Sequence, residues 1–158
     1  MRTLIVSFLS ALTALAVFSV AASAQTLIDA KDPEVIRNLA SGYGSATLTT
    51  TSDGEPKIVG RVDGIQYLIY FYGCEAQINC DSIQFSAAWL DVENFTAETA
   101  SEWNLTRRIG KAFVDGDGDP WLQWDVNLVG GVSLTNIDDT IDWWIFTLKQ
   151  FTNFMRDL

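Results

Sequence analysis

The residues best suited to chemistry are three aspartates in one short segment. Asp115, Asp117 and Asp119 alternate with glycine and precede Pro120. This spacing resembles the start of an EF-hand loop, which places oxygen ligands for calcium at alternate positions. An EF-hand also needs Gly at its sixth position and Glu at its twelfth, where this chain has Pro120 and Val126. A weak calcium- or ligand-sensing site at this turn is therefore one alternative function, but Asp and Gly are also the ordinary residues of a hairpin turn.

Carboxylates can also act as general acids and bases, so Asp115 to Asp125 define an alternative function, a carboxylate-based hydrolase. That function requires a pocket in which acids with shifted pKa values converge. Asp138, Asp139 and Asp142 form a second acidic group, but acids near the start of a helix simply stabilise its dipole. The chain has no histidine, which excludes Ser-His-Asp and Cys-His catalysis and the usual nitrogen ligand of zinc. We therefore expect a non-catalytic protein without a cofactor.

Arg107, Arg108 and Lys111 form the one basic cluster of an acidic chain. The sequence has 10 Lys and Arg against 20 Asp and Glu, a net charge of −10, which argues against nucleic acid as a partner. The cluster could contact an anion, such as an acidic peptide or a carboxylate. The simpler interpretation is that the three cations complement the dipole at a helix C-terminus and pair with Asp125.

The first 24 residues have the pattern of an export signal. A single positive charge at Arg2 precedes an apolar run from Leu4 to Val20, and Ala22-Ser23-Ala24 provides a small-x-small cleavage site. We expect cleavage after Ala24, which leaves residues 25–158 as a single domain with no further membrane span. The expected location is the periplasm or the exterior of the cell.

The two cysteines agree with an exported protein. Cys74 and Cys80 are separated by five residues and lie between two strand-like segments. In an oxidising compartment such a pair predicts a disulfide that closes the end of a hairpin. Closing a loop this short stabilises a fold by roughly 2–2.5 kcal/mol.

The hydrophobic pattern predicts an α+β domain, with an antiparallel sheet packed against helices in the order α-β-β-β-β-α-β-β-α. The segment 65–71 is apolar on both faces, so we expect it to be a central strand. The predicted helices run from Asp32-Pro33 to Gly42, from about Thr96 to Arg108, and onward from a cap at Thr135. The predicted strands cover residues 46–50, 58–62, 65–71, 83–89, 111–114 and 121–126.

The last helix has more apolar surface than one sheet requires. Beyond its main apolar stripe, Trp143 and Phe154 widen that stripe on one flank and Phe146 points the opposite way. The extra aromatic residues either pack on another helix or form a surface for a partner. The partner would be an unidentified protein or peptide, or a second copy of the chain in a homodimer.

Several short motifs are spread in order along nearly all of the chain after the signal segment. They are Gly42-Tyr43, 67–74, 82–85, Trp103-Asn104, 108–112, 118–120 and 124–126. Together they resemble the YbjN-domain family. The resemblance implies an α+β domain similar to the type III secretion chaperone fold, in proteins labelled sensory transduction regulators, and supplies no catalytic residues.

The signal segment and the cysteine pair depart from cytoplasmic members of the family. We therefore expect an exported interaction domain with a sensory, regulatory or chaperone-like role.

Overall fold

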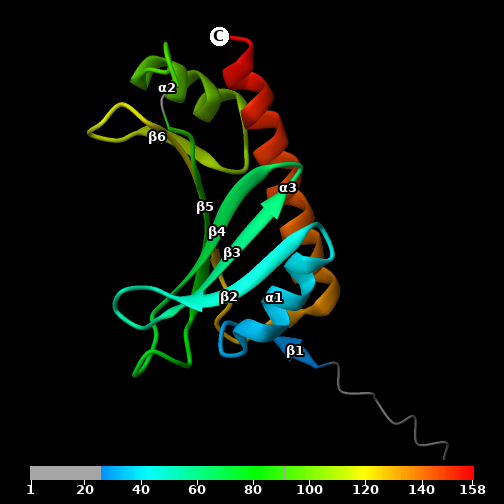
Figure 1. Ribbon diagram of the computed structural model, residues 1–158. Helices are drawn as coiled ribbons and strands as arrows, with labels where there is room; N and C mark the ends of the chain where they lie inside the picture. The colour runs from blue at the N-terminus through cyan, green and yellow to red at the C-terminus, as the bar shows by residue number, and fades with distance from the viewer. Residues whose placement is uncertain (1–25, 91) are drawn as a thin grey trace, which may run out of the picture.

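The computed structural model describes residues 26–90 and 92–158, so the predicted signal peptide and its cleavage site lie outside the described residues. The structure is α+β, and this prediction is confirmed (Figure 1). The elements in chain order are β1 (Leu27–Ile28), α1 (Pro33–Ser41), β2 (Ser45–Thr50), β3 (Pro56–Val62), β4 (Ile65–Tyr72), β5 (Ser82–Ala88), α2 (Ala97–Thr106), β6 (Lys111–Val114), β7 (Pro120–Asn127), β8 (Val132–Ser133) and α3 (Leu134–Arg156).

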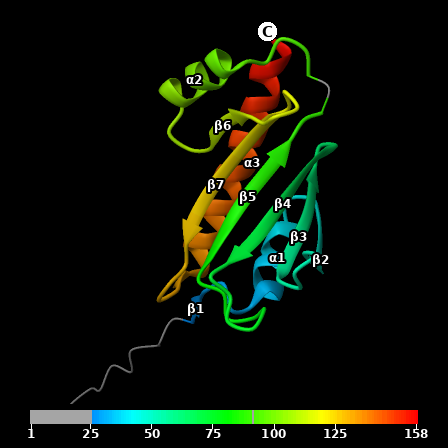
Figure 2. The ribbon, with the colours of Figure 1, turned by 90° about the vertical axis from the view of Figure 1, so that its left-hand side faces the viewer.

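Six strands form one antiparallel sheet in the order β2-β3-β4-β5-β7-β6. The helices α1 and α3 cover one face of this sheet, whereas its other face carries no helix over its centre (Figures 1 and 2). The strand β4 lies inside the sheet, between β3 and β5, as its apolar pattern predicted. Its two faces differ, however, because Tyr67, Ile69 and Phe71 are buried while Tyr72 on the uncovered side is exposed. The pair β1–β8 forms a separate two-stranded sheet that the sequence pattern did not indicate.

Local residue chemistry explains the ends of the first elements. The Asp32 side chain accepts a hydrogen bond from the Val35 amide, Pro33 occupies the first turn, and α1 stops at Gly42. Asp63 and Gly64 both have positive φ, as a two-residue hairpin with the twist of the flanking strands requires. The prediction of a helix and a hairpin at these positions is confirmed.

The core is an aromatic layer between α3 and the sheet. The Trp144 ring stacks on Phe85 with centroids 5.3 Å apart and meets the edge of Tyr67 at 6.3 Å. The Tyr67 ring in turn lies so close to Gly60 that a Cβ atom at that position would collide with it. Two turns further along α3, Phe151 contacts Trp103 of α2, with ring centroids 4.8 Å apart. The long helix therefore ties α2 and the sheet into one core.

Two helix boundaries differ from their predicted positions. The helix α2 ends at Thr106, and Arg107 is already extended, so the predicted end at Arg108 is wrong. The chain turns back here because the buried Trp103 indole donates a hydrogen bond to the Gly110 carbonyl. The predicted cap Thr135 is also wrong: Ser133 accepts a hydrogen bond from the Asn136 amide. Ser133 is the last residue of β8 and pairs with β1. The helix α3 therefore begins directly where β8 ends.

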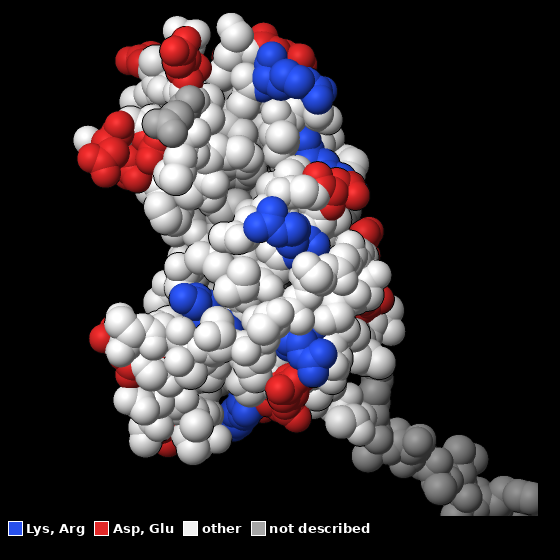
Figure 3. Space-filling view, viewed as in Figure 1, with Lys and Arg blue, Asp and Glu red and all other residues white. Residues whose placement is uncertain are grey.

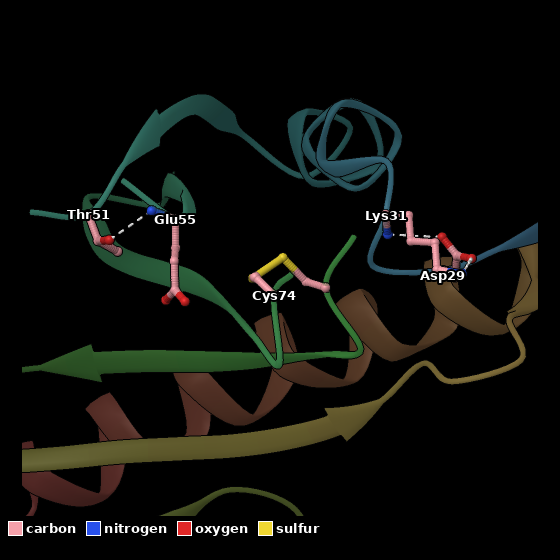
Figure 4. Close-up of a disulfide and its surroundings, with 6 residues drawn as sticks. Asp29, Lys31, Thr51, Glu55 and Cys74 are labelled. Atoms are coloured by element: carbon pink, nitrogen blue, oxygen red, sulfur yellow. Dashed lines mark hydrogen bonds and ion pairs between the residues drawn. A yellow bond between two sulfur atoms is a disulfide. The ribbon is translucent and has the colours of Figure 1, made fainter. Parts of the chain in front are cut away.

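The structure joins Cys74 and Cys80 in a disulfide, as predicted. The bridge closes the connection between β4 and β5, and Figure 4 shows the Thr51–Glu55 turn on one side of it and the Asp29–Lys31 segment on the other. Within the bridged loop, the Gln77 side chain donates a hydrogen bond of 2.8 Å to the Asp53 carbonyl. The disulfide thus closes the loop, and the Gln77 hydrogen bond ties the closed loop to the neighbouring β2–β3 turn.

The edge strand β6 is closed by a side chain of α2. The Asn104 amide group donates to the Ala112 carbonyl at 2.9 Å and accepts from the Ala112 amide at 2.8 Å. At Ala112 one side chain thus supplies both hydrogen bonds that a further strand would make, which hinders pairing of this edge with another chain.

We expect Asn104→Ala to lower the free energy of unfolding by about 1–3 kcal/mol, because it leaves a donor and an acceptor of the part-buried strand unpaired. Equilibrium denaturation in urea measures this change. Glu102→Ala, an exposed position on the same helix, is the control and should stay within about 0.5 kcal/mol of the parent. Equal losses in both variants would contradict the edge-closing role.

Candidate functional site

Two aromatic side chains stand exposed on the outer face of α3. Trp143 is 43% exposed and Phe146 is 52% exposed. Their rings meet edge to face, with centroids 6.1 Å apart. Residues three apart on a helix share a face, so the helix itself brings the two rings together. We call Trp143 and Phe146 the outer aromatic pair.

Hollows flank the outer aromatic pair on both sides. The first has a volume of about 340 Å³ and is also lined by Asp142, Ile145 and Lys149. The second, of about 280 Å³, continues past both rings to Arg107 and Arg108. Trp143 and Phe146 line both hollows; the first lies on α3 alone, and the second lies between α3 and the segment that follows α2. We call the two hollows together the groove.

The structure therefore places two of the predicted basic residues beside the predicted aromatic surface. The Arg107 guanidinium lies 5.2 Å from the centre of the Trp103 ring, which holds it over the end of α2. Lys111 lies 3.5 Å from the Arg107 carbonyl and does not line either hollow. The expected pairing of this cluster with Asp125 is wrong, since the Asp125 carboxylate accepts a hydrogen bond from Gln84 on the neighbouring strand.

Phe154, the third residue of the predicted partner surface, has a different environment. It is partly buried against the core, with its ring 5.5 Å from Trp103 and 6.3 Å from Phe151. Phe154 therefore packs at the edge of the core, and the exposed aromatic surface of α3 consists of the outer aromatic pair.

The acidic segment forms the turn between β6 and β7, at the upper left of Figure 3. The Asp115 carboxylate accepts hydrogen bonds from the Asp117 and Asp119 amides at 3.0 Å and from the Trp121 indole at 2.8 Å. These bonds, with the Trp121 indole as the largest cause, lower the pKa of Asp115. A lowered pKa is the reverse of what a general acid needs. The carboxylate is thus engaged in shaping the turn.

The geometry of this turn supports neither a calcium site nor a carboxylate-based hydrolase. Within residues 26–90 and 92–158, no group of three or more Cys, Asp or Glu side chains is arranged to hold a metal ion. Asp115 bonds within its own turn, whereas Asp125 bonds to Gln84 on the sheet, so the two carboxylates do not share a hydrogen-bond network.

The acidic group at the start of α3 contacts the first helix. The Tyr43 hydroxyl lies 3.1 Å from both the carbonyl oxygen and Oδ1 of Asp138 and donates to them. Burial, this hydrogen bond and the charges of Asp138, Asp142 and Asp139 raise the pKa of Tyr43 to about 12. This contact ties the segment after α1 to the first turns of α3. Asp138 therefore has a structural partner.

Lys149 and Gln150 are among the groove-lining residues that the sequence pattern missed. Lys149 forms an ion pair of 2.7 Å with Asp63 of the β3–β4 turn. Residues 143, 146, 147 and 150 follow helical spacing, so the wheel of α3 already contained the signal for this face. No local sequence pattern indicates that the segment after α2 lies beside this face of α3.

The described part of the chain contains no helix that is both long and apolar enough to cross a membrane. A family model described as “YbjN: Putative bacterial sensory transduction regulator” matches residues 32–157. No curated protein matches the chain.

The raised pKa of Tyr43 predicts a loss of stability in alkali. The folded state keeps the Tyr43 proton up to about pH 12, whereas the unfolded chain releases it near 10.0, so the contribution is complete below pH 10.0 and disappears as the pH rises to about 12. We expect the stability advantage of the parent over Tyr43→Phe to shrink across this range. Urea denaturation at a series of pH values measures it, and a constant difference up to pH 12 would contradict the Tyr43–Asp138 contact.

Proposed function

The chain belongs to the YbjN family, and from this premise we propose that it is an exported, non-catalytic interaction domain that serves a regulatory role by binding a protein or peptide. The observation that carries the proposal is the outer aromatic pair with a hollow on each side. Large aromatic side chains beside well-formed pockets dominate the binding energy of protein interfaces.

The energetics of exposure support a binding role for this surface. Trp143 and Phe146 expose about half of their area to solvent, although the same helix buries Trp144 completely. Burying apolar surface stabilises a protein or a complex by about 25 cal/mol for each Å² removed from water. The exposed rings do not contribute this free energy to the fold. A partner that covers both rings recovers this free energy on binding.

The chemistry of the chain favours binding over catalysis. The sequence contains no histidine, the carboxylate of Asp115 is engaged by its own turn, and Asp138 accepts the Tyr43 hydroxyl. The groove itself is lined by one carboxylate, that of Asp142, so it lacks the pair of acids that a hydrolase of this kind uses.

Export is supported by two independent features of the chain. The segment up to Ala24 has the charge, length and terminal small residues of a signal peptide. The disulfide Cys74–Cys80 is of the kind that persists in oxidising compartments and is rare in the cytosol. We propose the periplasm or the cell exterior as the place of action.

The test is site-specific photo-crosslinking of the exported protein in its native bacterium. A benzophenone amino acid replaces Gln150, which lines the groove, or Leu105, which is 85% exposed on α2. We expect a discrete adduct from position 150 and none of that mass from position 105. In the Trp143→Ala/Phe146→Ala background the adduct should fall about tenfold or more, because central aromatic residues carry most of the binding energy.

The control background is Leu134→Ala/Leu158→Ala, which removes two apolar side chains that are each 50% exposed. This background should keep the adduct. An adduct that survives loss of the outer aromatic pair, or equal labelling from both positions, would contradict the proposal. An adduct of twice the mass of the chain would identify a second copy as the partner.

A further inference from the structure

We propose that the groove binds an acidic peptide segment of its partner, with a carboxylate on Arg107 and Arg108 and a neighbouring apolar side chain between Trp143 and Phe146. This inference rests on the proposed function and names the chemical class of the partner.

The two arginines have no carboxylate partner in the described part of the chain. The sequence has 20 acidic residues against 10 basic ones, so internal partners are abundant. Yet the ion pairs within residues 26–90 and 92–158 join Lys31 to Asp29, Arg37 to Glu34 and Lys149 to Asp63, and neither Arg107 nor Arg108 takes part. Both side chains are exposed. Two adjacent cations thus remain available to an anion from outside.

The end of α2 places both arginines at the second hollow. Arg107 caps the C-terminus of α2, where a positive charge is favourable. Arg108 is the next residue along the chain, and both side chains line the second hollow.

The Arg107 side chain is oriented before any partner arrives. Its guanidinium lies over the Trp103 ring, and the indole of Trp103 is itself buried and fixed by its hydrogen bond to the Gly110 carbonyl. The Arg107 Nη1 group donates a hydrogen bond of 3.4 Å to the Thr106 carbonyl, and the other N–H groups at the edge of the guanidinium can bind a carboxylate. Little side-chain entropy is then lost on binding.

The charges along the groove set the direction of the bound segment. Asp142 lines the first hollow, where it repels a carboxylate, and Lys149 beside it already pairs with Asp63. Arg107 and Arg108 line the second hollow. The acidic side chain therefore lies at the α2 end, and the apolar side chain lies toward Asp142.

Each hollow has room for a side chain of a bound peptide. The volumes of about 340 and 280 Å³ lie at the lower limit of pockets that enclose a whole small ligand, which run from roughly 300 to 1,000 Å³. Two such hollows separated by a pair of rings suit neighbouring side chains of one peptide, held by shape at the rings and by charge at the arginines.

The test is selection from a random twelve-residue peptide library on residues 25–158 with the disulfide intact. We expect the selected peptides to be enriched in Asp or Glu close to Trp, Phe or Leu. Their dissociation constants, measured by fluorescence anisotropy, should rise about tenfold or more in Arg107→Glu/Arg108→Glu and at high salt. Arg107→Lys/Arg108→Lys should have an intermediate effect, because lysine keeps the charge and loses the paired hydrogen bonds.

Lys31→Glu/Lys57→Glu changes the net charge by the same amount away from the groove and should leave affinity within about twofold if the effect is local. Peptides that need Trp143 and Phe146 but show no acidic enrichment, or that bind Arg107→Glu/Arg108→Glu equally well, would overturn this inference and leave the proposed function standing. A selection that yields no peptide dependent on Trp143 and Phe146 would overturn both.

Discussion

The contact of α3 with a single face of the sheet is the interaction on which the rest of the structure depends. Trp144 stacks on Phe85 of the central strand β5, and Phe151 meets Trp103 of α2, so one helix joins the sheet to the element that closes its far edge. The indole N–H of Trp144 finds no hydrogen-bond partner among the described residues, so the contacts of its ring with Phe85 and Tyr67 hold this side chain in place.

This one-sided packing divides α3 into two faces with different chemistry. The outer face carries Trp143 and Phe146 in contact with solvent. The inner face fills the core with the buried side chains Ile137, Ile141, Trp144, Ile145, Leu148, Phe151 and Met155. The same packing brings the end of α2 beside the outer face, because Trp103 is buried against Phe151 and the chain turns directly after it. The position of Arg107 next to the exposed rings is thus a consequence of how the core is built.

Periodicity and capping chemistry predicted most of the architecture, because each acts over a few residues. The Asp32-Pro33 start, the Asp63-Gly64 turn and the cysteine bridge are examples. The errors arose where a distant partner decides the outcome. Ser133 replaces Thr135 as the cap because of its pairing with β1, and Asp125 turns to Gln84 across the sheet. The exposed aromatic residues were visible on a helical wheel, but their meeting with Arg107 and Arg108 depends on tertiary packing.

We propose that the outer aromatic pair serves binding, whereas the buried face of α3 serves folding. The free energy of unfolding of Trp143→Ala/Phe146→Ala, compared with that of Trp144→Ala, separates the two roles. We expect a loss of less than about 1 kcal/mol for the exposed pair, as for other surface positions. For the buried tryptophan we expect a loss of about 3–5 kcal/mol. A double variant that unfolds as easily as Trp144→Ala would show instead that the outer aromatic pair supports the fold.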